Sequence, residues 1–132
     1  MCNPLVSGCH HIAMRAKDFE KSVDFYARTL GLNIAARWGD GENKAVMLDM
    51  GNDCCLEIFA GGKGDMPEGT LLHFALATED CDAATERVRS AGAKITMEPE
   101  TIDVKGTPPF TVRIAFFKGP DGEIVEFFQK LR

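Results

Sequence analysis

The sequence lacks the features that would place it in several large classes of protein. It contains no long apolar stretch, and its N-terminus has no basic segment followed by an apolar one, so we predict neither a membrane span nor a secretory signal. It has no run of basic residues and a net charge of −5, which argues against nucleic acid and anionic membrane as partners. With 45% apolar and 27% charged residues, the composition is that of an ordinary globular protein.

Cysteine is present, but it is not arranged as a disulfide framework or a cysteine zinc site. The five cysteines are odd in number, include one adjacent pair and contain no C-x-x-C spacing. We therefore expect reduced thiols and a cytoplasmic location. The residues are Cys2, Cys9, Cys54, Cys55 and Cys81.

The first half of the chain reads as a strand, a helix and three strands. CHHIAMRA has strand character and is followed by Asp18, a good helix N-cap. FEKSVDFYARTLG then carries apolar residues at helical spacing and stops at Gly31. Three apolar runs, LNIAARW, KAVMLDM and CCLEIFA, are separated by turn-rich segments and predict three strands.

The second half repeats this pattern after the glycine-rich segment GGKGDMPEG. We expect a strand in LLHFALATED, a helix with Ala84, Val88 and Ala91 on its apolar face, and strands in AKITME, TVRIAFFK and EIVEFFQ. His11 and His73 lie 62 residues apart, as do Asp18 and Asp80. The sequence therefore predicts a single α+β domain over residues 1–132, built from two βαβββ modules at about 8–61 and 70–130.

Two glutamates, Glu57 and Glu126, sit at matched places within apolar strands. An unpaired buried carboxylate costs several kcal/mol, so these positions need a partner. Because side chains alternate across a strand, both glutamates share the face opposite the helices with His11 and His73. Two imidazoles and two carboxylates converging on one face suit a divalent cation, so we predict these four residues as metal ligands.

Each ligand also has an ordinary explanation when it is taken singly. A lone histidine in an apolar strand is usually a satisfied core residue, and a lone glutamate in an amphipathic strand usually faces water. The recurrence of both on matched strands favours the metal site. His10 is an alternative to His11, but its side chain points to the other face, and we expect a surface histidine there.

The segments that carry these residues resemble the vicinal oxygen chelate superfamily, the glyoxalase and bleomycin-resistance group. HIAMRAKDFEKSVDFYARTLG is similar to its first-module signature, and LEIF, LHFALATED and FFKGPDGEIVEFFQ are similar to its other metal-bearing segments. The resemblance covers nearly the whole chain. It implies a cupped mixed sheet around the metal with the helices on the outer face, and a homodimer.

Within that superfamily, the ligand order His, Glu, His, Glu is similar to that of bacterial-type glyoxalase I. The resemblance implies a lactoylglutathione lyase holding one divalent ion, nickel, zinc or cobalt. Its reaction converts the hemithioacetal of methylglyoxal and glutathione to a thioester through an enediolate. In that reaction Glu126 would move the proton, and Glu57 would be a ligand and possible base on the opposite side. Arg15 shares the metal face and matches a glutathione-binding arginine of some members; a rim arginine paired with an acid is the alternative.

Two departures leave the substrate open. After Glu57 the chain reads Phe59, Ala60, Gly61, Gly62, with little to bind a peptide, and the loop over residues 101–110 is longer than in the short bacterial enzymes. That loop would either cover the site with Lys105, Pro108 and Phe110 or be a plain surface loop. The alternatives are an epimerase or dioxygenase acting on another small oxo or hydroxy compound, and a non-catalytic drug- or metabolite-binding protein.

Overall fold

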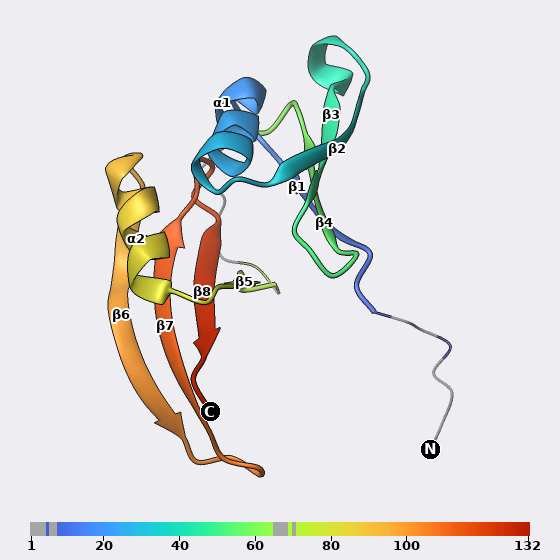
Figure 1. Ribbon diagram of the computed structural model, residues 1–132. Helices are drawn as coiled ribbons and strands as arrows, with labels where there is room; N and C mark the ends of the chain where they lie inside the picture. Colours follow the sequence, from blue (N-terminus) through green and yellow to red (C-terminus); the bar gives the residue numbers. More distant parts are fainter. Residues whose placement is uncertain (1–4, 6–7, 65–68, 70) are drawn as a thin grey trace.

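The computed structural model describes the chain at Leu5, residues 8–64, Gly69 and residues 71–132 (Figure 1). Cys2 lies outside these residues. So does most of the N-terminal segment from which the absence of a secretory signal is predicted. Within the described part, no helix has the length and apolar character needed to cross a membrane.

The first module forms one four-stranded mixed sheet and one helical segment. Its elements are β1 (His11–Arg15), α1 (Phe19–Asp24), η1 (Phe25–Thr29), β2 (Asn33–Trp38), η2 (Gly41–Asn43), β3 (Ala45–Asp49) and β4 (Cys55–Phe59). The strand order is β1-β4-β3-β2, with β1 parallel to β4 and the other pairs antiparallel. The edge strand β2 is exposed along its whole length, and Trp38 at its end is 43% exposed.

The second module has the same topology. Its elements are β5 (Phe74–Ala77), α2 (Cys81–Ser90), β6 (Lys94–Val104), β7 (Phe110–Lys118) and β8 (Ile124–Lys130). Their order, β5-β8-β7-β6 with β5 parallel to β8, matches that of the first sheet strand for strand. The predicted α+β class with two βαβββ modules is therefore confirmed, and each module contributes a sheet of its own (Figure 1).

Both helices begin and end where the sequence predicts. The side chain of Asp18 accepts a hydrogen bond from the Lys21 backbone N–H at 3.2 Å, and Asp80 accepts one from Ala83 at 3.0 Å. Gly31 and Gly92 follow the last turns with φ of 76° and 93°, a conformation that glycine adopts without steric cost. The caps thus fix both helices by local chemistry.

Three details differ from the prediction. The last five residues of the first helical segment, η1, form a π-helix rather than an α-helix. The buried side of α2 is Cys81, Thr85 and Val88, whereas Ala91 is exposed because it lies past the last turn. The predicted loop over 101–110 is reduced to residues 105–109, because β6 continues to Val104 and pairs with Phe110 at the start of β7.

The two modules meet where α1 and η1 lie over the turn between β7 and β8 (Figure 1). Asp121 in that turn is only 3% exposed and accepts hydrogen bonds from the Lys17 backbone N–H at 2.7 Å and the Ser22 hydroxyl at 2.8 Å. The hydroxyl of Tyr26 donates to Glu123 at 2.6 Å. Apolar side chains of both modules belong to one buried cluster, so the junction is part of the core.

Candidate functional site

The first predicted ligand pair lies on neighbouring parallel strands of the first sheet. His11 begins β1 and Glu57 lies in the middle of β4, where Ala13 is its register partner. The ring Nε2 of His11 is 3.4 Å from a carboxylate oxygen of Glu57. The glutamate is 9% exposed, whereas the histidine is exposed. A nitrogen and an oxygen donor therefore converge on the open face of this sheet.

The second pair repeats this arrangement in the second sheet. Glu126 of β8 has Ala75 of β5 as its register partner, and His73 immediately precedes β5. The ring Nε2 of His73 is 3.2 Å from a carboxylate oxygen of Glu126, which is 8% exposed. A histidine thus lies beside a buried glutamate twice, once in each module.

The four side chains are not brought together within one chain. Among the described residues, no group of three or more His, Cys, Asp or Glu side chains is arranged to hold a metal ion. Each module presents two donors on its own sheet, and the sequence pattern alone does not show this separation. Each His–Glu pair is therefore a half-site, and a complete set of four donors requires two half-sites to face each other.

Each half-site suits a cation by the chemistry of its donors. Glu57 and Glu126 are buried, and neither accepts a hydrogen bond from the described residues. The nearest polar side chain to each carboxylate among these contacts is an imidazole, that of His11 or His73. Imidazole nitrogen and carboxylate oxygen are ligands that divalent transition metals accept. The residues present therefore fit a shared metal ion, two donors from each half-site.

The histidines are held by neighbours that the sequence does not reveal as functional. The Nδ1 atoms of His10 and His11 are 2.9 Å apart, which leaves Nε2 of His11 directed at Glu57. In the second module, the ring of His73 packs edge-on against Phe116, with ring centroids 5.2 Å apart. Phe116 is the register partner of Glu126, a relation that depends on the pairing of β7 with β8.

Arg15 is exposed on the same face of β1 as His11. Its guanidinium donates to the Ala60 carbonyl at 3.0 Å and lies 5.5 Å from the centroid of the Phe59 ring. Among the described residues, Arg15 makes no ion pair with an acidic side chain. The charge is held in place and remains open to a ligand.

The loop at the end of β6 and β7 does not lie over Glu126. Phe116 faces Glu126 across the sheet, and Phe110 lies six residues away along β7, which is about 20 Å of strand. Residues 105–109 are exposed at the far end of this hairpin (Figure 1). Within its own chain, the hairpin tip is an extension of the sheet and not a cover for the His73–Glu126 pair.

A second group of titratable side chains lies at the junction between the modules. Burial raises the pKa of the Glu123 carboxyl, and the hydrogen bond from Tyr26 acts in the opposite direction. Burial, followed by the charge of Glu123, raises the pKa of Tyr26 well above its usual value, so Tyr26 remains a hydrogen-bond donor. These groups hold the junction together and lie outside the His–Glu pairs.

The fold and the paired donors define a class of protein: two βαβββ modules, each with a His–Glu pair on its open face. A family model described as the Glyoxalase/Bleomycin resistance protein/Dioxygenase superfamily matches residues 8–127. The chain belongs to this superfamily. The resemblance seen in the sequence is thereby confirmed.

Several members of this superfamily are similar to the chain over most of its length. A protein of Synechocystis named probable lactoylglutathione lyase is 31% identical over 127 residues, covering 90% of this chain and 92% of the relative. A probable lactoylglutathione lyase of Vibrio cholerae is 29% identical over 126 residues, covering 90% and 88%. The crystal structure of TnmS3, an antibiotic binding protein from Streptomyces sp. CB03234, matches at 25% identity with a TM-score of 0.75, covering 97% of this chain and 99% of that one.

Proposed function

We propose that the chain is a metal-dependent isomerase of the glyoxalase I type, acting on the hemithioacetal of methylglyoxal and a thiol such as glutathione. The observation that carries this proposal is the repeated His–Glu pair, His11 with Glu57 and His73 with Glu126. The similarity to proteins named lactoylglutathione lyase supports it. The product is the corresponding lactoyl thioester.

The active unit in this proposal is a homodimer with two composite sites. His11 and Glu57 of one protomer face His73 and Glu126 of its partner, because one chain alone assembles only two donors in each place. Exposed apolar side chains on both modules support a second copy as the missing surface; Ile34, Trp38, Leu71 and Leu72 are 44%, 43%, 87% and 56% exposed.

The four side chains would hold one divalent ion, nickel, zinc or cobalt, which when bound would supply positive charge near the substrate oxygens. Glu126 takes the proton from the substrate carbon and returns it to the neighbouring carbon. Glu57 lies on the other side of the composite site and serves as ligand and second base. A buried carboxylate that accepts no other hydrogen bond suits a positioned base, since no other group competes for its lone pairs.

Arg15 binds the substrate in this proposal. Its guanidinium is fixed by Ala60 and Phe59 on the His11 face, so it can pair with a carboxylate of the thiol portion without first becoming ordered. The reaction itself takes place at the carbon held near Glu126. Arg15 should therefore affect substrate affinity more than turnover.

Complementation between two inactive variants tests the composite site. Each of His11→Ala and His73→Ala breaks both sites of a homodimer. A mixed dimer of the two variants regains one intact site, so random exchange should restore about one quarter of the wild-type activity. The assay is lactoylglutathione formation after reconstitution with nickel or zinc, with metal content measured in parallel. Metal binding with no restoration would overturn the shared site, and metal binding without any turnover would overturn the reaction.

A non-catalytic binder is the second candidate function. The observation that favours it is the structural similarity to an antibiotic binding protein at 25% identity. Metal removal by a chelator distinguishes the two candidate functions, because a binder would keep its ligand affinity after metal removal whereas the isomerase would lose activity. The retention of both His–Glu pairs favours the enzyme.

A further inference from the structure

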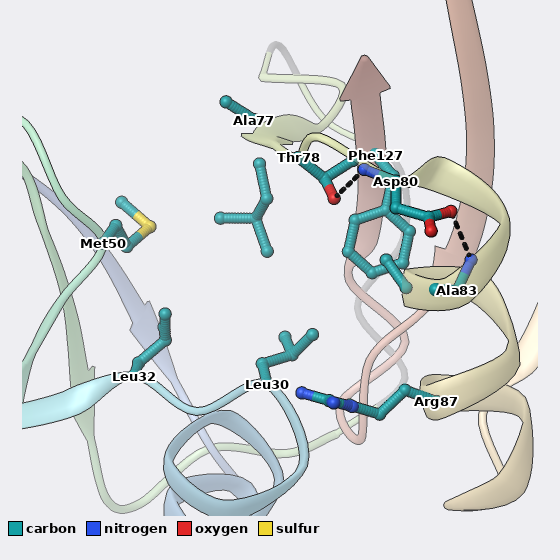
Figure 2. Close-up of a pocket in the computed structure, with 11 residues that line it drawn as sticks. Leu30, Leu32, Met50, Ala77, Thr78, Asp80, Ala83, Arg87 and Phe127 are labelled. Atoms are coloured by element: carbon teal, nitrogen blue, oxygen red, sulfur yellow. Dashed lines mark hydrogen bonds between the residues drawn. The ribbon is translucent and has the colours of Figure 1, made fainter.

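A pocket separate from the His–Glu pairs opens between the two modules, on the helix side of the sheets. Its wall is made by the end of η1 and the start of β2, the end of β3, the end of β5, and α2 (Figure 2). Phe127 lines it from β8, on the face opposite that of Glu126. The pocket thus lies behind the sheet that carries the second half-site.

Apolar side chains form one part of the pocket, and polar groups form the rest. Leu30, Leu32, Met50, Leu76 and Phe127 line it, and its volume is about 310 Å³. Except for buried Phe127, these side chains are only half-buried, so a ligand would remove apolar surface from water. Small-molecule sites have volumes of about 300–1,000 Å³, which limits an occupant here to a small ligand.

The guanidinium of one arginine side chain reaches into the pocket. Arg87 of α2 extends across the pocket toward Leu30 (Figure 2). Among the arginines of the described residues, Arg87 alone has neither an ion pair nor a side-chain hydrogen bond; Arg89, two residues further on, is bound to both Glu86 and Glu98. The guanidinium of Arg87 therefore has all its donors available.

The acidic residue of the pocket lies at its other end. Asp80 caps α2 by accepting from the Ala83 backbone N–H, so its charge is satisfied at the helix N-terminus. Seven residues of helix separate it from Arg87, which is about 10 Å along the axis. A negative group at Arg87 is thus remote from Asp80, and the space between them is lined by hydrocarbon.

The other side of the same junction is cross-linked by hydrogen bonds. There α1 and η1 are joined to the β7–β8 turn by the hydrogen bonds of Asp121 and Glu123. The corresponding helix of the second module, α2, makes no hydrogen bond to the β3–β4 turn within the described residues, and Met50 lies across the pocket from it (Figure 2). The junction therefore has hydrogen bonds between the modules on the side of α1 and η1, and none between α2 and the β3–β4 turn among the described residues.

We propose that this pocket binds a small amphiphile with a single carboxylate, its anionic group on Arg87 and its hydrocarbon part between Leu30, Leu32, Met50 and Leu76. The ligand class follows from one free guanidinium at the edge of an apolar cavity. This site is separate from the proposed isomerase site and does not depend on it.

Titration of the full chain with octanoate, followed by ¹H–¹⁵N NMR, tests the site. Saturable shifts are expected at the amides of Leu32, Met50 and Arg87. Arg87→Gln should weaken binding about tenfold or more, the loss expected for one charged hydrogen-bonding partner. Arg89→Gln is the matched control, since it removes the same charge from the same helix, and it should bind as the wild type does. Ala83→Phe places an aromatic ring in the pocket and should abolish binding.

Four outcomes would overturn the proposal. The first three are the absence of saturable shifts at millimolar octanoate, equal weakening by Arg87→Gln and Arg89→Gln, and equal affinity for 1-octanol, which has the same chain length without the charge. The fourth is a set of shifts confined to the exposed strand β2, because it would show that octanoate adsorbs to that surface and not to the pocket.

Discussion

The two modules share their donors but differ in what supports them. Both have the same strand order and place one histidine 3.2–3.4 Å from one buried glutamate. The supports are different at equivalent positions: His10 contacts His11, whereas Leu72 precedes His73, and Arg15 of β1 corresponds to Ala77 of β5. Phe116 packs on His73 where the first module has Met47 opposite Glu57.

This difference separates what metal binding requires from what substrate binding requires. If the four donors bind one ion as proposed, the ion constrains them, and this explains why they recur in both modules. The residues around the donors can differ between the modules. The first module has an additional imidazole, that of His10, and the guanidinium of Arg15. We infer that substrate recognition is concentrated on the first module and proton transfer on the second.

The largest expected effect is on the two glutamates. Glu126→Gln should lower kcat about 10²–10⁴-fold with metal still bound, because the amide retains a ligand oxygen but cannot take a proton. Glu57→Gln should lower kcat less. Steady-state kinetics with metal analysis on the same samples makes the comparison. Equal losses would make the modules catalytically equivalent, and near-wild-type rates for Glu126→Gln would remove it as the base.

The next effect concerns His10. Replacing it by leucine, the residue of the second module, removes the 2.9 Å contact with Nδ1 of His11, so metal affinity should fall about 10- to 100-fold. His10→Asn restores a polar partner and should recover part of this loss. Competition with a chromophoric chelator measures both variants. If leucine leaves the metal affinity unchanged, His10 is a surface residue, as the sequence suggests.

Arg15→Ala introduces the residue of the second module at the matched position of β1. KM should rise about tenfold while kcat changes little, because a charged partner of the bound substrate is lost. Arg28→Ala is the control: that arginine is exposed and paired with Asp24 on the helix surface. An unchanged KM for Arg15→Ala would place the substrate anion elsewhere.

The smallest effect is a pH dependence at the junction. Burial raises the pKa of Glu123, so the folded protein keeps this proton to a higher pH than the unfolded chain does. The stability contributed by Glu123 is therefore fully present below the unfolded pKa and is lost as the pH rises through the folded pKa. Glu123→Gln removes this titration. The variant should gain stability relative to the wild type as the pH rises from about 4 to 8, measured by thermal unfolding; a constant difference would contradict the assignment.

Local patterns in the sequence predict most of this fold. Asp18 and Asp80 identify the helix starts, Gly31 and Gly92 their ends, and GPDG the last hairpin, because caps and turns are set by neighbouring residues. The continuation of β6 to Val104 was missed because it depends on pairing with β7 across the sheet.

The site is less accessible to such reasoning. Alternation along strands places the four residues on the face opposite the helices, but it reveals neither their arrangement as two His–Glu pairs nor the position of these pairs on separate sheets. His10 and Phe116 could not be recognised as supports, since their contacts depend on side-chain orientation and strand register. The assignment of all four residues as ligands of one ion stays a prediction.

The single tyrosine and the single tryptophan both belong to the first module, Tyr26 buried in η1 and Trp38 half-exposed at the end of β2. The intrinsic fluorescence of the chain excited in the near ultraviolet therefore reports on that module through Trp38 and on the junction through Tyr26. Circular dichroism in the far ultraviolet detects the backbone of both. If the shared core makes the modules unfold as one unit, the two signals will change together, and any separation between them would measure how independently each repeat comes apart.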